Sequence, residues 1–360
     1  MVEQDSLALL ERLCLAAGPP GGEQAVRSVV RDALRGVGSL SYDRLGSLIC
    51  SLPGSAARPR VVLDSHLDEV GFMVQSVSED GTLRLVPLGG WWGHVLLGQR
   101  VDVMAESARV AGVIGSKPPH FLDPDERERV IKPDAMFIDI GASDRAGALA
   151  TGVRVGDLVV PHAEFMRLAV PGVVSGKALD NRAGVALMCE ALVALAGREH
   201  PNTVVGVGAV QEELGGRGAG TAAEIARPDV ALVLECTPAD DVPAGRVRQA
   251  ALGGGPQIRH FDPTAVSNRR LVRFVESVAA ELGIAVQMAV RASGGTDAQT
   301  IHRFREGVPT VVIGVPARYI HSHVALLQME DYRAAARLVV ELVVRMHAER
   351  VASFTRYEDA

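Results

Sequence analysis

Residues 204–216 read VVGVGAVQEELGG, an apolar, glycine-broken run that stops at two adjacent carboxylates, Glu212 and Glu213. On its own, a Glu-Glu pair is most simply a solvated loop. The run before it, however, has the length and composition of a strand that is covered on both faces. Two like charges at the end of a buried strand are costly unless a positive group lies beside or between them. The stretch therefore predicts a buried sheet with a charged site at one edge.

Helical and strand patterns alternate along most of the chain. Helices are expected over residues 5–17, 23–36, 180–197, 268–283 and 329–354. Short apolar runs between turn residues predict strands over 203–210, 229–235 and 309–315, and the run over 60–74 predicts a strand that ends in polar residues. Helices that alternate with buried strands indicate an α/β domain.

The pattern changes between residues 72 and 164. The segment SEDGTLRLVPL (78–88) places an Asp-Gly turn between alternating segments, which is a hairpin signal. Later segments of the same region repeat this style. We therefore expect a small β-domain at residues 72–164, inserted into a catalytic α/β domain made of residues 1–71 plus 165–360.

Composition and charge exclude several classes of protein. The 360 residues are 48% hydrophobic and 22% charged, which is typical of a globular protein. A formal net charge of −6 gives no electrostatic reason to expect a nucleic acid or an anionic membrane as partner. No signal peptide or membrane span is recognisable, and the four cysteines are scattered. We expect a cytoplasmic protein with reduced thiols.

Imidazole and carboxylate groups follow several of the apolar runs. They are His66, Asp68, Asp180, Glu212, Glu213, Glu235, His321 and His323. Each has a simpler explanation: His66 could be a core histidine, Asp180 a helix N-cap, and the others surface loop residues. Ligands of such sheets bind beyond the carboxyl ends of strands, so one shared site is favoured over many separate explanations. The glycines of GGRGAG (215–220) lack the ending of a phosphate-binding loop.

A site of this kind needs cations. Two histidines and three carboxylates can hold two divalent ions about 3.5–4 Å apart. Each ion would take one imidazole, one terminal carboxylate and a share of a bridging carboxylate. One of the paired glutamates would bind metal, and its neighbour would stay free as a proton acceptor. Zinc, cobalt and manganese all accept this mixed set of nitrogen and oxygen ligands.

With these residues in view, the chain resembles the TET-type (tetrahedral) co-catalytic metallo-aminopeptidases. These are relatives of glutamyl and deblocking aminopeptidases, some of which carry an endoglucanase label. The blocks that carry the resemblance are SHLDEVGFMV, PLGGWWGHVLLGQRV, GVIGSKPPH, GKALDNRAG, QEELGGRGA, SGGTDA and PARYIHSH. The resemblance implies a zinc-exopeptidase-like mixed sheet flanked by helices, with an inserted small β-barrel or PDZ-like dimerisation domain.

The resemblance also implies roles for individual residues. The implied metal ligands are His66, Asp180, Glu213, Glu235 and His321. Asp180 would bridge the ions and precede a cis peptide, Asp68 would orient the His66 ring, and Glu212 would be the general base. Asp297 would lie near the substrate, with a helix N-cap as the alternative. His120 is expected at a subunit interface, with reach into a neighbouring active site as the alternative, and His323 in a loop or behind the ligands. Typical members have Asp where this chain has Glu235.

The implied activity is hydrolysis of N-terminal residues from short peptides by a water that two metal ions activate. Zinc or cobalt would be the most usual ions, with manganese as a third possibility. Subunits would pair through the β-domain and assemble into a tetrahedral dodecamer. Because of Glu235, a two-metal deacylase or carboxypeptidase-like amidase is the alternative. A metal-free glycosidase and a shell-forming protein with a degenerate site are weaker interpretations.

Overall fold

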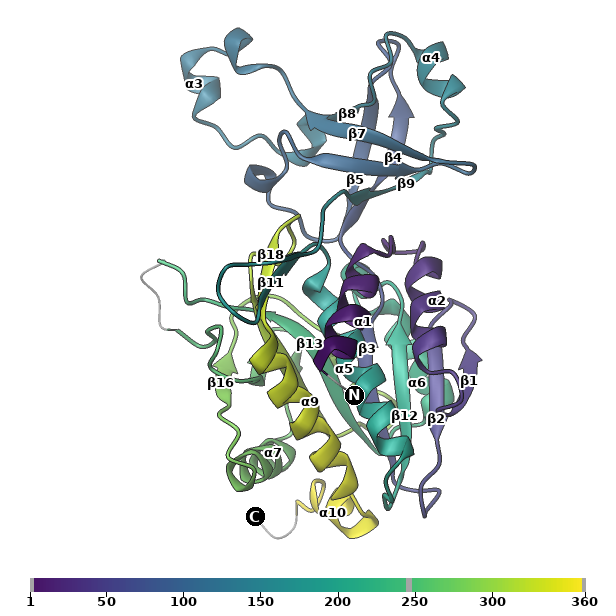
Figure 1. Ribbon diagram of the computed structural model, residues 1–360, viewed down its shortest axis with the longest axis vertical. Coiled ribbons are helices and arrows are strands. Elements are labelled where there is room, and N and C mark those ends of the chain that lie inside the picture. Colours follow the sequence, from purple (N-terminus) through teal and green to yellow (C-terminus); the bar gives the residue numbers. More distant parts are fainter. Residues whose placement is uncertain (1–2, 244–247, 358–360) are drawn as a thin grey trace.

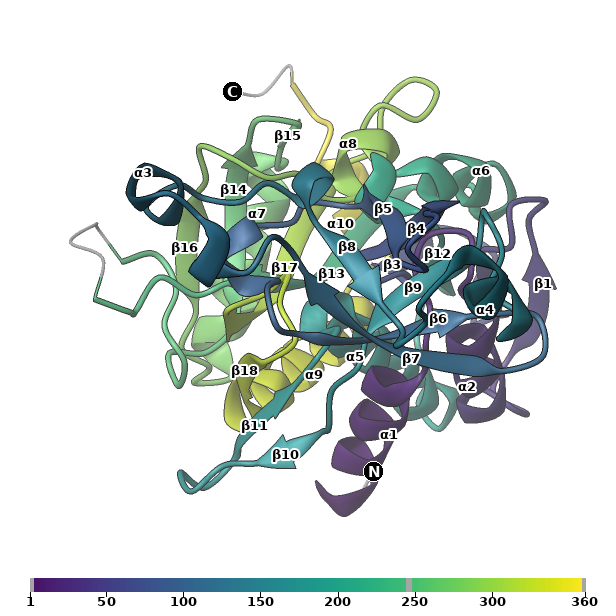
Figure 2. The ribbon, with the colours of Figure 1, turned by 90° about the horizontal axis from the view of Figure 1, so that it is seen from above.

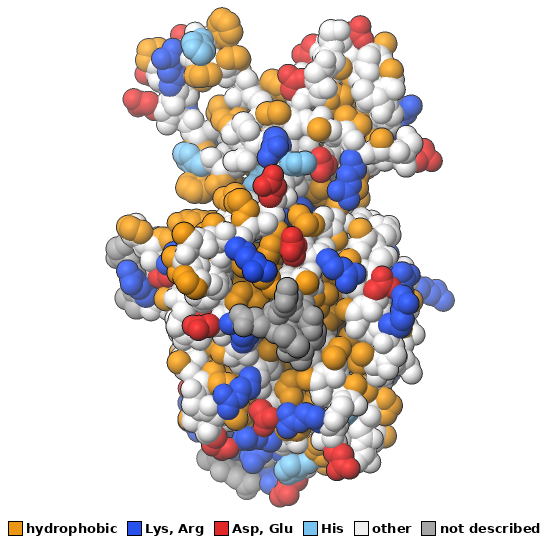
Figure 3. Space-filling view, in the orientation of Figure 1, with side chains coloured by type: hydrophobic (Ala, Val, Ile, Leu, Met, Phe, Trp, Pro, Cys, Tyr) orange, Lys and Arg blue, Asp and Glu red, His pale blue; other side chains and the backbone are white. Residues whose placement is uncertain are grey.

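The computed structural model describes residues 3–243 and 248–357, which form two parts stacked along the longest axis of the molecule (Figure 1). The larger part is a mixed β-sheet with helices on both faces, and the smaller part is a closed barrel above it. A narrow waist separates them in the space-filling view, where positive and negative side chains are interspersed (Figure 3). The architecture confirms the predicted fold class.

The large sheet has twelve strands with a parallel centre. Its main path runs β1 (Ser39–Tyr42), β2 (Leu48–Leu52), β12 (Thr203–Ala209), β3 (Arg60–His66), β13 (Val230–Pro238), β17 (Thr310–Arg318), β18 (Ala325–Gln328), β11 (Val173–Gly176) and β10 (Met166–Arg167). The strands β14 (Gln257–Asp262), β15 (Ala265–Val266) and β16 (Gln287–Val290) extend from β17. Because β12, β3, β13 and β17 pair in parallel, their carboxyl ends meet at one edge.

Helices cover both faces of this sheet, as the view from above shows (Figure 2). One layer holds α1 (Glu3–Leu15), α2 (Gln24–Ala33), α5 (Leu179–Ala196), α7 (Arg269–Glu281) and α9 (Met329–Val344), and the other holds α6 (Arg217–Ala226) and α8 (Ala298–Ile301). Side chains alternate along β3, so Val61 and Leu63 pack into the first layer and Val62 into the second. Burial on both faces explains the continuous apolar runs in the sequence.

The smaller part is a closed barrel with its own apolar core. Its strands follow the order β4 (Gly71–Val77), β5 (Leu83–Leu88), β8 (Phe137–Asp139), β7 (Arg109–Gly115), β6 (Arg100–Met104) and β9 (Leu158–Pro161). The short helices α3 (Pro124–Arg127) and α4 (Arg145–Ala150) lie on its connections. Phe72, Val101 and Ile138 are among the buried residues that fill it. Barrel closure leaves no open edge for uncontrolled pairing.

Two of the expected elements are broken. The strand expected over 60–74 ends at His66, and the chain resumes as β4 of the barrel at Gly71. The amide of Leu67 donates the last hydrogen bond of the β3–β12 pairing, to the Ala209 carbonyl, after which the chain leaves the sheet. The helix expected over 329–354 ends at Val344, and α10 (Ala348–Ser353) starts anew with the His347 side chain accepting from the Arg350 amide. A capping side chain thus starts a second helix that periodicity alone cannot separate from the first.

Among the helices of the described residues, none combines the length and apolarity that crossing a bilayer requires.

Candidate metal centre

The predicted site residues gather at the edge where the parallel strands end. His66 is the last residue of β3, and Glu235 lies in the adjacent strand β13. Glu212 and Glu213 follow β12 in the single-turn helix η4 (Glu212–Leu214), after Gln211 adopts a left-handed conformation (φ 58°). This local reversal turns both glutamates toward the same cavity instead of opposite faces.

Asp180 lies between the two histidines. Its Oδ1 is 3.4 Å from Nε2 of His66, and its Oδ2 is 3.4 Å from Nε2 of His321. Glu213 Oε1 lies 3.2 Å from the His321 nitrogen, and Glu235 Oε2 lies 3.7 Å from the His66 nitrogen. Ligand atoms of His66, Asp180 and Glu213 all lie within 4.8 Å of one another. The carboxylate of Asp180 therefore faces two imidazoles with one oxygen each.

The charge of this cluster calls for cations. Burial raises the pKa values of Glu212, Glu213 and Glu235, because desolvation disfavours their charged forms. Burial opposes a charge on His321, but hydrogen bonds to Asp180 and Glu213 outweigh it and raise the pKa of the imidazole to about 11. Within the described chain, ion pairs connect these acids only to the two histidines. The donor set and its excess of negative charge fit divalent cations.

Each histidine is oriented through its other ring nitrogen. Nδ1 of His66 lies 3.2 Å from the backbone oxygen of Asp68, and Nδ1 of His321 lies 2.7 Å from the backbone oxygen of Gly90. A proton on Nδ1 would be donated to these carbonyls, which leaves both Nε2 atoms free to bind metal. Gly90 belongs to the connection after β5, so the barrel part contributes to the site. The PLGGWWG block thus orients the His321 ring, which its sequence does not indicate.

The Asp68 carboxylate has a further task that the sequence interpretation missed. It is fully buried, and its Oδ1 lies 3.5 Å from the His66 ring. Its two oxygens also accept hydrogen bonds from the backbone amides of Glu212 (3.0 Å) and Glu213 (3.1 Å). Asp68 thus fixes the turn that carries the paired glutamates as well as lying beside the imidazole.

Three other predicted residues do not line the cavity that the two imidazoles face. Asp297 is fully buried, does not line the cavity and makes no capping hydrogen bond to α8. His323 is buried and its Nε2 lies 2.9 Å from the Arg100 carbonyl, so it joins the two parts of the molecule behind the ligands. His120 is exposed on a connection of the barrel, where its interface role stays a prediction.

The cluster opens into a cavity of about 350 Å³. His66, His321 and the carboxylates line one side of it. The other wall carries the polar side chains of Arg259, Thr264, Arg291, Ser293 and Thr296. The two arginines and Thr264 were not singled out in the sequence, whereas Ser293 and Thr296 belong to the SGGTDA block. The wall forms because β14, β16 and the loop before α8 come together only in the folded sheet.

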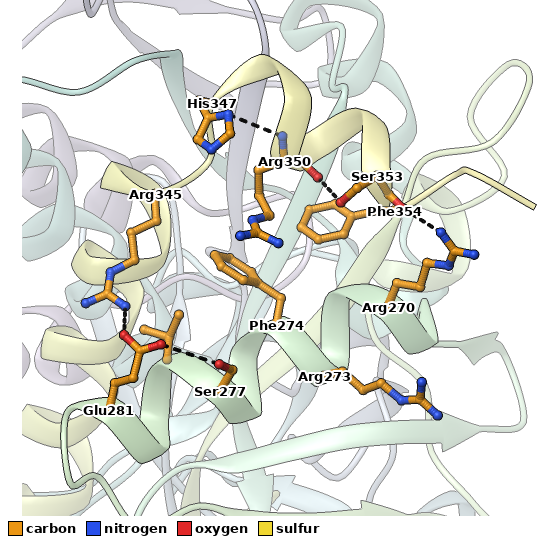
Figure 4. Close-up of a pocket in the computed structure, with 11 residues that line it drawn as sticks. Arg270, Arg273, Phe274, Ser277, Glu281, Arg345, His347, Arg350, Ser353 and Phe354 are labelled. Carbon is orange, nitrogen blue, oxygen red and sulfur yellow. Dashed lines mark hydrogen bonds and ion pairs between the residues drawn. The ribbon is translucent and has the colours of Figure 1, made fainter. Parts of the chain in front are cut away.

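A second hollow, of about 580 Å³, lies among α7, α9 and α10 (Figure 4). Arg350 lies over the ring of Phe274, and Arg345 pairs with Glu281. Glu281 is the one carboxylate among its lining residues, and no carboxylate there faces two imidazoles. This hollow therefore does not compete with the cluster at the strand ends as a centre for divalent cations.

The chain is similar to known aminopeptidases over nearly its whole length. A model of the M42 glutamyl aminopeptidase family matches residues 46–338. The chain is 36% identical to the putative aminopeptidase FrvX of Escherichia coli over 98% of this chain and 99% of the relative. The TET aminopeptidase of a marine sediment Thaumarchaeota archaeon has 44% identity and a TM-score of 0.95, covering 98% of this chain and 100% of the other.

A third similar protein has a described assembly. The Pyrococcus horikoshii TET1 peptidase, which can assemble into a tetrahedron or a large octahedral shell, has 31% identity to this chain and a TM-score of 0.85. That match covers 95% of this chain and 100% of the other. The match to the family model spans most of the sequence. The chain therefore belongs to the M42 glutamyl aminopeptidase family of metal-dependent aminopeptidases.

Proposed function

We propose that this protein removes N-terminal residues from short peptides at a centre of two divalent cations. The observation that carries the proposal is the Asp180 carboxylate, whose two oxygens face two different imidazoles at 3.4 Å each. His66 with Glu235 would hold one ion, and His321 with Glu213 the other. When bound, such a pair of ions lowers the pKa of a water molecule and polarises the carbonyl under attack.

Glu212 is proposed as the general base. Of the five carboxylates that lie near an imidazole nitrogen of His66 or His321, that of Glu212 is the farthest, at 3.9 Å from Nε2 of His66. Its backbone is held by Asp68, so the side chain projects into the cavity without being committed to a ligand position. Burial raises its pKa, which favours a carboxylate that accepts a proton from water and returns it to the leaving amine.

Glu235 supports the same assignment although typical members have Asp at this position. Its Oε2 reaches to 3.7 Å from the His66 nitrogen, so the longer side chain stays within the cluster. The deacylase and carboxypeptidase-like amidase alternatives use the same ligands and differ in which end of the substrate is held. The products formed distinguish these alternatives from an aminopeptidase.

The test is cleavage of a mixed library of short peptides, with free and acetylated N-termini, by protein reconstituted with zinc, cobalt or manganese. We expect mass spectrometry to show stepwise loss of residues from free N-termini. Protein treated with a chelator is the control and should release nothing. Removal of acetyl groups or of C-terminal residues would support the alternative amidase, and no N-terminal trimming with any metal would contradict the proposal.

We further propose a preference for an acidic N-terminal residue. Arg259 donates to Asp262 at 3.1 Å and Arg291 donates to Asp240 at 2.8 Å, which holds both guanidinium groups at the cavity wall. Among the described residues, the Nε atom of each arginine is buried without a hydrogen-bond partner. These Nε atoms are too enclosed for a substrate to reach, but both arginines line the cavity, where their positive charge favours a substrate carboxylate. This agrees with the glutamyl description of the family.

Arg291→Met is expected to lower kcat/KM for N-terminal Glu substrates by roughly 10- to 100-fold, the usual cost of losing a hydrogen bond to a charged group. Leucyl substrates should change by much less, because their side chain makes no such bond. The measurement compares glutamyl, leucyl and lysyl p-nitroanilides with both proteins. An equal loss on all three substrates would show that Arg291 acts on the fold and not on selectivity.

The barrel is proposed as the dimerisation unit, with dimers assembling into a tetrahedral dodecamer. Trp92, Phe121 and Val130 are exposed large apolar residues on its connections, as expected for surfaces that a neighbouring subunit covers. The assembly described for the Pyrococcus horikoshii peptidase supports the same arrangement. We also propose a cytoplasmic location, with which four free, buried cysteines agree.

A further inference from the structure

A buried ion cluster lies directly behind the metal centre. Glu69 is its only acid, and Lys177 and Arg182 are its bases; all three are at most 5% exposed. The Lys177 ammonium lies 2.7 and 2.6 Å from the two oxygens of Glu69. Arg182 Nη2 lies 3.3 Å from Oε1, which also accepts from the backbone amide of Gly18 at 3.1 Å. Every Glu69 oxygen is therefore engaged.

In the sequence, the members of this cluster lie next to or on either side of residues at the candidate metal centre. Glu69 follows Asp68 in the turn between β3 and β4, and Leu67 in the same turn accepts a hydrogen bond from Arg182. Lys177 stands three residues before Asp180, and Arg182 two residues after it. The cluster thus joins the segment that carries His66 and Asp68 to the segment that carries Asp180.

Regular secondary structure does not orient Asp180. The residue has φ −83° and ψ 107°, outside helical values, and Ala178 before it adopts a left-handed conformation with φ 56°. The next residue, Asn181, is tied to the sheet because its side-chain Nδ2 donates to the Leu234 carbonyl at 2.9 Å. The segment before Asp180 is held by Lys177. The direction of the Asp180 carboxylate therefore depends on side-chain contacts on both sides of it.

We propose that Lys177 is a positioning residue of the metal centre, because its ion pair with Glu69 sets the direction of the Asp180 carboxylate between His66 and His321. The inference rests on the proposed role of Asp180 as a ligand shared by two cations. Lys177 itself lies outside the cavity and touches neither imidazole. It acts through Asp180, and its loss should change how cations are held and not only how stable the fold is.

The charge balance makes a test variant feasible. With one acid and two bases, the cluster carries one excess positive charge. Lys177→Met removes that excess and fills similar space, while Glu69 keeps Arg182 and the Gly18 amide as partners. The variant should therefore fold with reduced stability. Lys177→Arg keeps the charge but cannot place one compact ammonium between both oxygens of Glu69.

The control variant is Asn202→Ala, which removes a buried polar contact far from the strand ends that carry the cavity. Its side-chain amide donates to the carbonyls of Val343 at 2.7 Å and Met346 at 3.0 Å, near the end of α9. It should lower the melting temperature without touching the cavity. It therefore reports what instability alone does to cation binding and to catalysis.

The experiment loads wild-type protein and the three variants with Co²⁺ and measures bound cobalt, the visible absorption spectrum, the melting temperature, and kcat and KM. We expect Lys177→Met to alter the cobalt spectrum and lower kcat on the order of 10- to 100-fold, with a smaller change in KM. Lys177→Arg should change the cobalt spectrum and kcat less than Lys177→Met does, and its melting temperature should stay near the wild-type value. Asn202→Ala should melt lower with an unchanged spectrum and kcat.

The inference is overturned if Lys177→Met behaves like Asn202→Ala, losing stability alone. Should Lys177→Met not fold, Lys177→Arg decides: an unchanged spectrum and kcat refute the role, and a shift in both supports it. The spectrum is independent of the reaction. If wild-type protein binds two cobalt ions but trims no peptide, the proposed function fails, while a spectral shift in the variants still supports the positioning role.

Discussion

Glu212→Gln is expected to remove most peptide hydrolysis while the protein keeps its divalent cations. Gln has the same shape as Glu but cannot accept a proton, so the loss should be on the order of 10²- to 10⁴-fold in kcat. Its backbone amide would still bind Asp68, which keeps the turn in place. The measurement is kcat on the preferred short peptide, together with metal content by mass spectrometry.

The neighbouring Glu213→Gln is the matched control for this result. Glu213 Oε1 lies 3.2 Å from the His321 nitrogen, so the same substitution one residue later should lose cations as well as activity. A different outcome at two adjacent positions would separate the proton acceptor from the ligand. If both variants kept full activity, the assignment of the two glutamates would be wrong.

Asp180→Asn is expected to lose both cations, and with them nearly all activity. Each oxygen of the carboxylate faces a different imidazole, whereas an amide offers one oxygen acceptor and an NH₂ group that cannot bind a cation. The remaining acids would then repel one another without compensation. Metal content after dialysis should fall from two ions per chain to less than one, and the melting temperature should stop responding to added zinc.

Asp331→Asn provides the comparison for this variant. Asp331 is also a buried carboxylate, but it accepts hydrogen bonds from the Gly253 and Gly255 amides, away from the cavity. It should lower stability while metal content stays at the wild-type value. Equal metal loss in both variants would mean that buried aspartates in general support the fold, and would remove the bridging role from Asp180.

The residue pattern alone determined the α/β class and the sheet edge at which the candidate site lies. The runs at 203–210, 229–235 and 309–315 became β12, β13 and β17, because strands covered on both faces must be apolar throughout. Polar residues that follow parallel strands lie at a common edge of the sheet, so Glu212, Glu213 and Glu235 can be grouped from the sequence alone.

Only the tertiary structure decided how the side chains of that edge are held. The Gly90 carbonyl of the barrel part orients the His321 ring. The Asp68 carboxylate accepts hydrogen bonds from the amides of Glu212 and Glu213. The ion pair of Lys177 with Glu69 holds the segment before Asp180. The partners in these contacts are separated by between 108 and 231 residues. The spacing of apolar residues in the sequence indicates which faces of helices and strands are buried, because burial repeats with the period of the element. A contact between two distant side chains has no period, so it emerges only when the chain is folded.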